Sequence, residues 1–560
     1  MQRPWLKHYP AGVPAEINAA EYASLADLIE RSCKRFADAP AYYSLGRTLS
    51  FAELDAQSRA FAAWLQNVAH LQKGERVALM MPNILQYPIA LFGVLRAGMV
   101  AVNVNPLYTA RELQHQLKDS GAKVIVILEN FAYVLADIIR DTAVEQVIVT
   151  GMGDALGLPK GPIVNLVVRY VRKLVPEYEL PGALSFNNVV NAGRFLQHAT
   201  PPLTHDDLAF LQYTGGTTGV SKGAMLTHGN MVANVLQSAS WLGSRTQPGR
   251  DIAITALPLY HIFSLTANCL VYCKLGGLNV LIANPRDFAD FVRTLSQFRF
   301  TYVSAVNTLF NALLNTPGFD QVDFSALNIS LGGGMAVQRA VAEQWKKVTG
   351  NVLTQAWGLT ETSPAACINP FELEEFNGSI GLPIPSTEIS IRDDAGADMG
   401  LNQPGEVCVR GPQVMRGYWQ RPDETAKVML PDGWLRTGDI GYMNDDGFVF
   451  LQDRKKDMIL VSGFNVYPNE VEDVIVKHPG VLEAAAVAQP DEKSGEVVAV
   501  FVVRKDPDLT AEQLIDFCRA DLTGYKVPRH VYFKNELPKT NVGKILRRAL
   551  RDELIGAPTR

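Results

Sequence analysis

The sequence predicts an α/β protein: a large N-terminal domain with two doubly wound α/β subdomains plus a β-rich subdomain, followed by a small α+β C-terminal domain. Three observations lead to this prediction. With 560 residues, 47% apolar and 19% charged, the chain can bury large cores but is too long for one domain. Strand-like and helix-like segments alternate along much of its length. The pattern then changes twice, near Gly378 and after Asp453.

A regular alternation indicates the first α/β subdomain. Ser50, followed three residues later by Glu53, is typical of a capping box at the start of a helix. Beyond it, apolar periodicity predicts a βαβαβ order, with strands at 77–81, 99–104 and 123–128 and helices at 84–95 and 110–120. Such an order produces a parallel sheet that helices cover on both faces.

The rest of the chain divides into three further regions. A second α/β series runs from about residue 251 to 354, with strands expected at 279–283, 301–306 and 328–331. Residues 378–452 show short alternating stretches between Gly, Pro and Asp turns, which predicts a smaller β-rich unit. The charged run DRKKD at 453–457 precedes enough chain for a separate domain. We therefore expect one domain at 1–453 and another at 454–560.

Composition excludes several classes of protein. Lys plus Arg number 52 against 57 Asp plus Glu, a net charge of −5, so no overall positive field favours nucleic acid. Six scattered cysteines without a CxxC pair fit neither a disulfide framework nor a zinc site. The N-terminus lacks a secretory signal pattern. Two uncharged stretches, 77–95 and 252–273, contain Pro, Asn and His and are interpreted as buried core rather than membrane spans. We expect a cytoplasmic protein.

One segment has the composition of a loop that binds phosphate. Residues 213–228, YTGGTTGVSKGAMLTH, contain four Gly, four Thr, one Ser and one Lys. Glycines let several backbone N–H groups point at one anion, hydroxyls add donors, and Lys222 adds a positive charge. The segment is not a Walker A loop, because Ser221 precedes Lys222 and Gly223 follows it. From composition alone, a plain flexible loop is the simpler interpretation.

Five motifs in order extend this observation along nearly the whole chain. TGGTTGVSKG, WGLTET (357–362), TGD (437–439), DRKKD (453–457) and NVGK (541–544) resemble the core motifs of the acyl-adenylate-forming superfamily. Residues 432–456 are similar to the fatty acyl-CoA synthetase signature. The chain therefore resembles bacterial long-chain fatty acyl-CoA synthetases, and residues 1–453 resemble their AMP-binding, or adenylation, domain.

The resemblance implies a two-step reaction with ATP, Mg²⁺ and CoA. A carboxylate is a poor electrophile, so a long-chain fatty acid first attacks the α-phosphate of ATP, which gives acyl-AMP and pyrophosphate. A thiol of CoA then displaces AMP. The resemblance also implies that the C-terminal domain is mobile and rotates about a hinge near Lys456 between the two steps.

The resemblance assigns the functional residues one by one. It implies catalytic roles for Lys222, His261, Glu361 and Lys544, and Mg²⁺ contacts for Glu361 and Thr214. The implied nucleotide and CoA contacts are Tyr213, Thr214, Gly215, Gly216, Thr217, Thr218, Gly219, Gly332, Gly333, Gly334, Trp357, Gly358, Thr360, Asp439, Arg454, Lys456 and Gly463. Lys544 would meet the carboxylate and α-phosphate, and Gly463 would lie beside the pantetheine of CoA.

One of these positions departs from the family pattern, and most have a plainer explanation. The family more often has Tyr where this chain has Trp357, so a hydroxyl contact at the nucleotide is in question. His261 in an apolar run is also typical of a hydrogen-bonded core residue. Asp439 could cap a turn, and Lys544 could lie on a solvated helix face. Without the surrounding motifs, the structural explanations are preferred.

Two other functions and one surface stay open. The chain could be an acyl-AMP ligase that does not use CoA, or a non-catalytic fatty-acid-binding or uptake protein. Residues 161–176, if helical, place six apolar side chains on one side and Arg169, Arg172 and Lys173 elsewhere. This pattern suits peripheral contact with the inner face of a membrane, or packing on the protein's own domain. A homodimer is compatible with the sequence.

Overall fold

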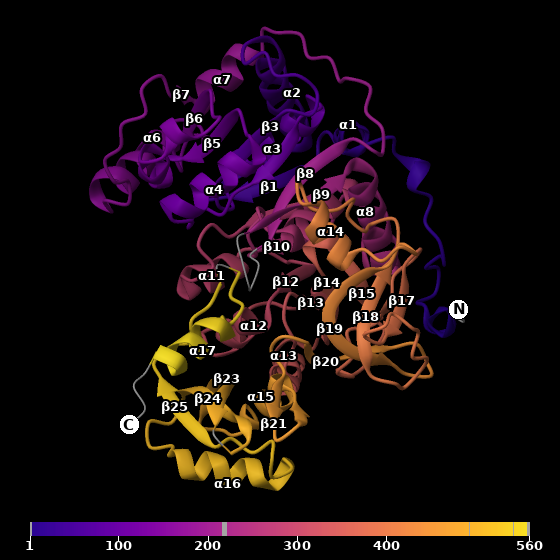
Figure 1. Cartoon of the computed structure of the whole chain (residues 1–560). Helices are drawn as coiled ribbons and strands as arrows, with labels where there is room; N and C mark the ends of the chain where they lie inside the picture. Colours follow the sequence, from indigo (N-terminus) through magenta and orange to yellow (C-terminus); the bar gives the residue numbers. More distant parts are fainter. Residues whose placement is uncertain (1–2, 215–220, 492, 541, 557–560) are drawn as a thin grey trace.

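The computed structural model describes residues 3–214, 221–491, 493–540 and 542–556. Figure 1 shows a large N-terminal body and a smaller C-terminal part, which carries strands β21 to β25 and lies below the body in this view. The predicted phosphate contacts Gly215, Gly216, Thr217, Thr218 and Gly219 lie outside the described residues. The predicted fold class, an α/β body with a small C-terminal α+β part, is confirmed.

The first large sheet has seven strands in the order β7–β6–β5–β3–β4–β8–β9. Its strands are β3 (Arg76–Met80), β4 (Val100–Asn103), β5 (Val124–Leu128), β6 (Gln146–Thr150), β7 (Leu184–Ser185), β8 (Leu208–Thr214) and β9 (Lys222–Thr227). Neighbouring strands are parallel except β8 and β9, which are antiparallel. The helices expected between the strands are α3 (Gln86–Arg96) and α4 (Ala110–Ser120). The five predicted elements are therefore confirmed to within two residues.

Local sequence signals explain these helices. The expected capping box of Ser50 and Glu53 opens α2 (Phe51–Asn67). Thr109 and Glu112 form another at the start of α4, which ends at Gly121 with φ +59°. Every residue of α3 is buried, because this helix lies between the sheet and α2. The uncharged stretch 77–95 is thus core, as expected.

The second large sheet has nine strands in the order β16–β15–β14–β13–β12–β10–β11–β1–β2. Its strands are β1 (Pro40–Ser44), β2 (Arg47–Ser50), β10 (Ile252–Thr255), β11 (Leu278–Leu281), β12 (Tyr302–Ala305), β13 (Ile329–Gly332), β14 (Leu353–Gly358), β15 (Ala365–Ile368) and β16 (Leu382–Pro383). β1 reaches it from the N-terminal region and pairs in parallel with β11. The sequence did not indicate this pairing, since periodicity within a segment does not name its partner.

Helices cover these two sheets. They are α1 (Leu25–Arg35), α5 (Ala132–Ala136), α6 (Lys160–Leu166), α7 (Phe186–Gly193), α8 (His228–Leu242), α9 (Ile262–Ser264), α10 (Val271–Leu275), α11 (Phe288–Leu295), α12 (Asn307–Leu314) and α13 (Arg339–Thr349). Residues 252–273 form β10, a turn and the buried helical run that includes α9. Among the described residues, no helix combines the length and apolar character needed to cross a bilayer.

The β-rich unit is a four-stranded antiparallel sheet in the order β17–β18–β19–β20. Its strands are β17 (Glu388–Arg392), β18 (Gly405–Arg410), β19 (Leu435–Met443) and β20 (Val449–Arg454), and α14 (Pro422–Val428) lies between β18 and β19 in the chain. β20 ends at Arg454, next to the predicted domain boundary. Arg454 pairs there with Asp439 of β19. The predicted β-rich unit is confirmed.

The C-terminal part has its own sheet and its own apolar cores. The sheet is built from β21 (Ile459–Val461), β22 (Phe464–Val466), β23 (Val481–Asp491), β24 (Gly495–Arg504) and β25 (His530–Lys534). Its helices are α15 (Pro468–Ile475), α16 (Ala511–Asp521) and α17 (Arg547–Gly556). Two clusters of buried residues, with members from Ile459 to Leu550, contain no residue of the body. The boundary at 453 and 454 stays a prediction that this separation supports.

Candidate active site

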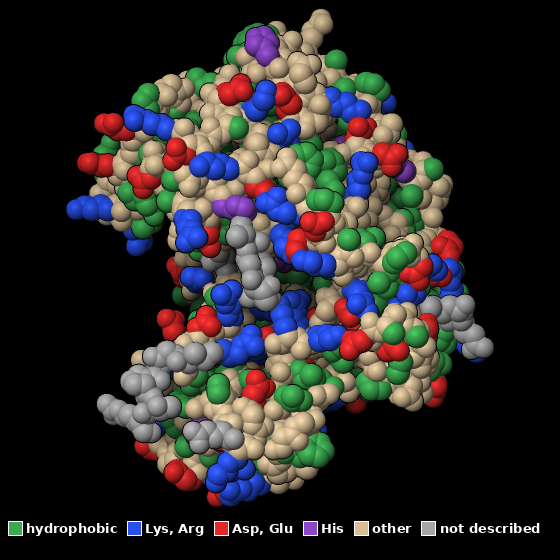
Figure 2. All heavy atoms as spheres, viewed as in Figure 1, with side chains coloured by type: hydrophobic (Ala, Val, Ile, Leu, Met, Phe, Trp, Pro, Cys, Tyr) green, Lys and Arg blue, Asp and Glu red, His purple; other side chains and the backbone are tan. Residues whose placement is uncertain are grey.

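A cavity of about 990 Å³ lies between the body and the C-terminal part. Figure 2 shows a hollow at this place, with several Lys and Arg side chains around it. The lining includes these predicted site residues: Tyr213, Thr214, Lys222, His261, Gly333, Gly334, Trp357, Gly358, Thr360, Glu361, Arg454, Lys456 and Lys544. Residues from four separate motifs, as far apart as 213 and 544, are therefore brought to one site.

The last residue of β8 and the first residue of β9 lie at the side of the cavity expected to hold phosphates. Thr214 is the last residue of β8, Lys222 is the first of β9, and the two are paired across the strands. The Lys222 ammonium makes an ion pair with Glu424 of α14 and lies 5.2 Å from the ring centre of Tyr418. Lys222 and Lys427 lower the pKa of Glu424 to about 2. The carboxylate thus stays ionised and keeps Lys222 at the cavity.

Glu361 lies on the same side of the cavity. It belongs to a short 3-10 turn, Thr360–Thr362, that follows β14, and its Oε1 accepts a hydrogen bond of 2.6 Å from the Tyr418 hydroxyl. Burial and the charge of Glu361 raise the pKa of Tyr418, so that its hydroxyl stays a donor. Sequence reasoning missed Tyr418 and Glu424. Both lie in RGYWQRPDETA at 416–426, whose only local signal is a conventional helix start at Pro422.

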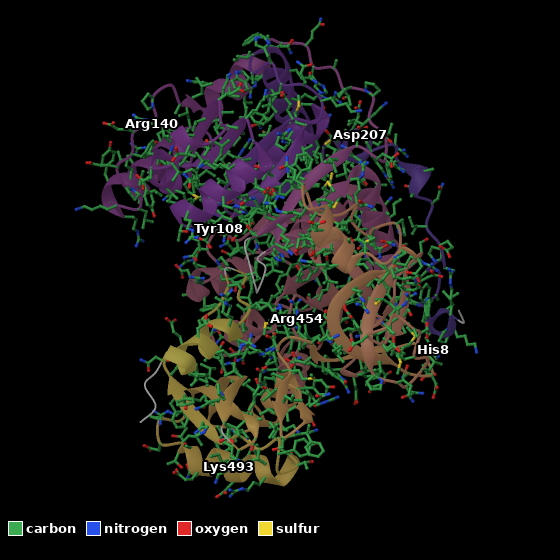
Figure 3. All side chains as sticks on the ribbon, viewed as in Figure 1. His8, Tyr108, Arg140, Asp207, Arg454 and Lys493 are labelled. Carbon is green, nitrogen blue, oxygen red and sulfur yellow. The ribbon has the colours of Figure 1, made fainter. Side chains whose placement is uncertain are left out.

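Trp357 and Asp439 form a buried polar pair on the nucleotide side. The Trp357 indole N–H donates to Asp439 Oδ2 at 2.9 Å, and Arg454 Nε lies 3.1 Å from Asp439 Oδ1. Figure 3 shows Arg454 where the C-terminal part meets the body. Asp439 is 4% exposed and borders a second, smaller cavity that also contains Trp357 and Lys544. The indole therefore supplies a polar contact within the protein where the family's usual Tyr would offer a hydroxyl.

Glycines allow the chain to pass close to this cavity. A Cβ on Gly333 would lie 3.1 Å from the Phe263 ring and 3.2 Å from the Ala356 carbonyl oxygen. A Cβ on Gly358 would lie only 1.8 Å from the Pro364 carbonyl oxygen. Gly334 has φ +78°, which favours glycine. Gly332, in contrast, ends β13 beneath the cavity and is outside its lining.

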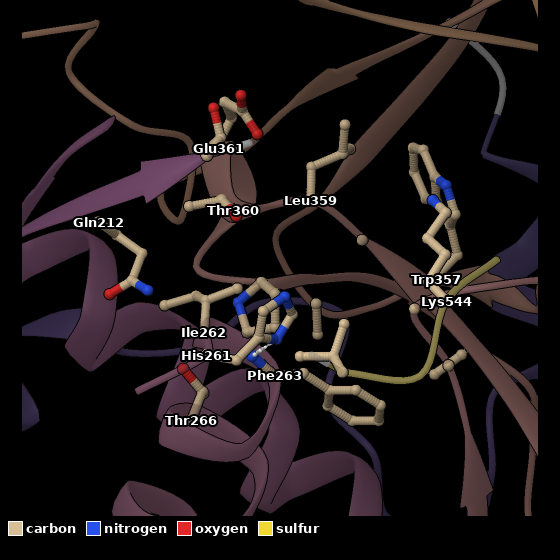
Figure 4. A pocket seen from close by; sticks show the side chains of 18 of the residues that line it. Gln212, His261, Ile262, Phe263, Thr266, Trp357, Leu359, Thr360, Glu361 and Lys544 are labelled. Carbon is tan, nitrogen blue, oxygen red and sulfur yellow. Dashed lines mark hydrogen bonds between the residues drawn. The ribbon is translucent and has the colours of Figure 1, made fainter. Parts of the chain in front are cut away.

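His261 lies where the cavity becomes apolar. Figure 4 shows His261 with Ile262, Phe263 and Thr266 on one wall, opposite the segment that carries Leu359, Thr360 and Glu361. The ring nitrogen Nδ1 accepts from the Phe263 backbone N–H at 3.3 Å. Burial, with a smaller effect from Lys544, lowers the pKa of His261 to about 4. A neutral imidazole with so low a pKa suits orientation of an acyl group better than proton removal.

Beyond His261 the lining is largely aliphatic and aromatic. It includes Leu242 of α8, Val271 of α10, Tyr302 of β12 and Leu331 of β13. These four side chains belong to one large cluster of buried apolar residues, which also contains other residues of α8. The cavity therefore has a polar end beside Lys222 and Glu361 and an apolar end, which fits a molecule with a charged head and a hydrocarbon chain.

Lys544 enters the cavity from the C-terminal part. Figure 4 shows it on the loop of that part, at the same end of the cavity as Trp357. Burial, with a smaller effect from the nearby Arg454, lowers the pKa of Lys544 to about 7. Burial likewise lowers the pKa of Lys456 to about 8, with Arg454 the second cause. A partly neutral lysine of this kind gains charge when an anion binds beside it.

Two predicted residues have a different environment. Gly463 lies outside the lining, at the turn between β21 and β22, with φ +84°. The hydroxyl of Tyr213 donates to Asp119 Oδ2 at 2.7 Å, so this residue lines the cavity with its ring while its polar atom faces the body. Their predicted contacts to CoA and nucleotide stay predictions.

Two protein-family models match the chain. The model of the AMP-binding enzymes matches residues 29–419, and that of the AMP-binding enzyme C-terminal domain matches residues 470–544. The chain belongs to the AMP-binding enzyme family. The first match contains Lys222, His261 and Glu361, and the second ends at Lys544.

Similar proteins cover the whole chain. A long-chain-fatty-acid–CoA ligase of Escherichia coli O157:H7 is 58% identical over 99% of each chain, and one of Bacillus subtilis is 37% identical over 99% of this chain and 98% of its own. The crystal structure of the anthranilate CoA ligase AuaEII with anthranoyl-AMP has a TM-score of 0.85 at 25% identity and covers 96% of this chain and 99% of that one. ATP-bound MatB from Rhodopseudomonas palustris has a TM-score of 0.79 at 27% identity, over 94% and 98% of the two chains.

Proposed function

We propose that this AMP-binding enzyme is a long-chain fatty acid–CoA ligase, which forms acyl-AMP from a fatty acid and ATP and then transfers the acyl group to CoA. The observation that carries the proposal is one cavity whose lining combines Lys222, Glu361 and Lys544 with a group of apolar side chains. The 58% identity to a long-chain-fatty-acid–CoA ligase over nearly the full chain supports the substrate class.

In the first half-reaction, the protein positions two anions against each other. The fatty acid lies with its chain in the apolar end and its carboxylate near His261, and the ribose of ATP is held by Asp439. The fatty acid oxygen attacks the α-phosphorus, and the bond to the β-phosphate oxygen breaks. Lys544 and Lys222 offset the charge that develops on the α-phosphate and on the leaving pyrophosphate.

Magnesium belongs to this proposal. Within the residues that the structure describes, no group of three or more His, Cys, Asp or Glu side chains could hold a metal ion by itself. A single carboxylate with phosphate oxygens is, however, the usual environment of Mg²⁺ in nucleotide sites. Glu361 and the Thr214 hydroxyl are the side chains that would hold it, and it would supply positive charge to the phosphates. The Tyr418 hydroxyl keeps the Glu361 carboxylate oriented.

The second half-reaction needs the thiol of CoA to reach the acyl carbonyl carbon. Lys544 borders the cavity next to Trp357, so we propose that the C-terminal part rotates about residues 454–457 to withdraw it. In this step the sulfur attacks the acyl carbon, the bond to the AMP oxygen breaks, and the thiol proton is lost to solvent. Gly463, on an exposed turn, would then face the pantetheine.

The test is a product analysis with oleate, ATP, Mg²⁺ and CoA. We expect AMP, pyrophosphate and oleoyl-CoA in equal amounts, with none of the three formed when oleate is omitted. Formation of ADP would contradict the proposal. Formation of oleoyl-AMP that CoA does not consume would favour an acyl-AMP ligase, and binding of oleate without any nucleotide cleavage would favour a non-catalytic fatty-acid-binding protein.

A peripheral contact with the inner, cytoplasmic face of the membrane is also part of the proposal. The helical run formed by α6 and residues 167–171 lies at the outer edge of the first α/β unit (Figure 1). The six apolar side chains expected on one side of residues 161–176 are all at least 36% exposed: Ile163, Leu166, Val167, Tyr170, Val171 and Leu174. Exposed Lys160, Arg172 and Lys173 lie in the same segment, whereas Arg169 is paired with Glu129. An exposed apolar strip beside exposed basic side chains suits an anionic lipid surface.

Vesicle flotation tests this contact. Charge reversal of Lys160, Arg172 and Lys173 to Glu should reduce binding to vesicles that contain phosphatidylglycerol by about 100-fold or more, at roughly 1 kcal/mol per basic residue. Reversal of exposed Lys34, Lys347 and Lys505 to Glu is the control with the same change in net charge. Equal binding of both variants would exclude the surface. A homodimer stays a prediction of the sequence, which sedimentation velocity measures directly.

A further inference from the structure

Lys544 lies on a turn that is closed by its own hydrogen bonds. The Thr540 N–H donates to the Lys544 carbonyl at 2.7 Å, and the Gly543 N–H donates to the Thr540 carbonyl at 2.9 Å. The Lys544 N–H donates to Thr540 Oγ1 at 3.1 Å. These bonds fix Lys544 relative to Thr540, so the place of Lys544 in the cavity depends on what holds this segment against the body.

Helix α12 of the body provides two hydrogen bonds to the C-terminal part. Thr308 Oγ1 donates to the Gly543 carbonyl at 2.8 Å, and Asn311 Nδ2 donates to the Leu482 carbonyl at 2.9 Å. The two donors are three residues apart, so they lie on the same face of the helix. Gly543 immediately precedes Lys544, and the first bond thus acts on the residue next to the lysine.

Both acceptors are carbonyl groups that irregular backbone leaves available. Between Val481 and Glu483 the pairing of β23 with β24 shifts by one residue, so Leu482 is the extra residue of a bulge. Gly543 has φ +84°, and a Cβ there would lie 3.0 Å from Thr308 Oγ1 and 3.1 Å from Val306 Cγ2. Glycine thus permits the close approach of this turn to α12.

The body holds α12 firmly at the same time. Asn307 exchanges two hydrogen bonds with Gln338, of 2.9 and 3.0 Å, and the Phe310 ring lies 4.6 Å from the Trp345 ring in α13. Thr308 itself is only 8% exposed. The donors are therefore fixed with respect to the rest of the cavity.

We propose that Thr308 and Asn311 form a release point: they hold the C-terminal part in the position that adenylates, and their two hydrogen bonds break when it rotates for thioester formation. The proposal rests on the proposed function. Thr308 and Asn311 are positioning residues, because they act through Gly543 and Leu482 rather than by touching substrate. Hydrogen bonds suit this task, since water replaces them readily when the surfaces separate.

The test separates the two half-reactions. Thr308→Val and Asn311→Leu remove the donors and keep the side-chain size. The readout is the ratio of two rate constants, acid-dependent pyrophosphate formation over thioester formation from preformed oleoyl-AMP. Loss of one hydrogen bond should lower this ratio about fivefold, and loss of both about 25-fold if the effects add. Thr316→Val is the control, because its hydroxyl donates to the Ala312 carbonyl within the body.

An unchanged ratio in the double variant would overturn the proposal, as would an equal loss in Thr316→Val. A merely structural role of α12 would lower both half-reactions together and leave the ratio unchanged. Thr308→Ser keeps the hydroxyl donor and loses only a methyl group. Its ratio should therefore be closer to the wild-type value than that of Thr308→Val.

A second readout does not depend on the proposed function. All six native cysteines are buried, so spin labels can be attached to Lys347→Cys on α13 and Lys505→Cys after β24, both exposed. Pulsed electron resonance should give one main distance, and the double variant should lose part of that population. An unchanged distance distribution overturns the release point. Absence of pyrophosphate formation by the wild type, with a changed distribution, instead overturns the ligase function alone.

Discussion

The two walls of the cavity are held in place by different kinds of interaction. On the body side, Trp357 and Leu331 belong to a large cluster of buried apolar residues that joins both sheets. On the side of the C-terminal part, α12 holds the Lys544 turn through Thr308 and the nearby Leu482 carbonyl through Asn311. Burying one large apolar side chain contributes about 1.5–3 kcal/mol, whereas one hydrogen bond contributes about 1 kcal/mol net.

The two kinds of interaction suit different tasks in the proposed rotation, in which the body side of the cavity stays in place and the C-terminal side moves. Apolar burial over a whole sheet can be undone only by unfolding it, because every buried side chain loses its neighbours at once. A few hydrogen bonds to backbone carbonyls can exchange with water in a rotation. If the C-terminal part rotates as proposed, the wall that carries Trp357 would stay in place and the wall that carries Lys544 would move away. Four predictions test or refine this contrast.

The largest effect is expected for Lys544→Ala. Adenylation, measured as oleate-dependent pyrophosphate release, should fall by about 10³-fold, because the variant loses the charge that Lys544 would bring to the α-phosphate. Thioester formation from preformed oleoyl-AMP should fall by less than about tenfold. An equal loss in both assays would mean that both half-reactions need Lys544, which would contradict its withdrawal between them.

Gly358→Ala tests the body side of the cavity, where Gly358 ends β14. Its Cβ would overlap the Pro364 carbonyl oxygen at 1.8 Å, so two paired strands would have to separate. We expect a loss of about 2–3 kcal/mol in the free energy of unfolding, measured with urea, and a parallel loss of both half-reactions. Gly524→Ala, which meets nothing within 4 Å, should leave both unchanged.

The pH dependence tests the charge of Lys544. Burial lowers its pKa from 10.5 to about 7, so the cationic fraction in the free enzyme falls as the pH rises through 7. For adenylation, kcat/KM should therefore fall about tenfold per pH unit well above pH 7. Lys544→Arg stays charged and should lose this fall, whereas Lys456→Arg should keep it. A flat profile for the wild type would contradict the lowered pKa.

The smallest effect is expected for Trp357→Phe. This change keeps a flat ring but removes the N–H that donates to Asp439 Oδ2. KM for ATP should rise about fivefold, the value of one hydrogen bond, with a similar weakening of oleoyl-AMP binding. In an Asp439→Asn background the same change should add little, because the two residues act as a pair. An additive result would show that the indole acts on the nucleotide directly.

Local patterns in the sequence predicted much of the fold and many of the residues around the cavity. The capping box at Ser50, the five elements of 77–128 and the β-rich unit depend on signals within a few residues, and they are as expected. The motifs around Lys222, Glu361 and Lys544 indicated residues that the structure brings to one cavity. Their chemical roles stay predictions.

Other features depended on contacts between distant segments. Nothing in 40–50 indicated that β1 and β2 extend the second sheet beside β11. No local pattern indicated that Glu424 would form an ion pair with Lys222 or that the Tyr418 hydroxyl would donate to Glu361. Periodicity and caps describe a segment, whereas these pairs join residues from 57 to 202 positions apart.

The sequence alone determined the α/β class and the order of the elements in 77–128, which follow from side-chain periodicity, and it contained the motifs by which the chain resembles an adenylate-forming superfamily. Only the tertiary structure decided that the Trp357 indole holds Asp439 and that α12 meets the C-terminal part through Thr308 and Asn311. The physical reason is that a hydrogen bond needs a donor and an acceptor within about 3 Å. Chain folding, not neighbourhood in the sequence, sets that distance.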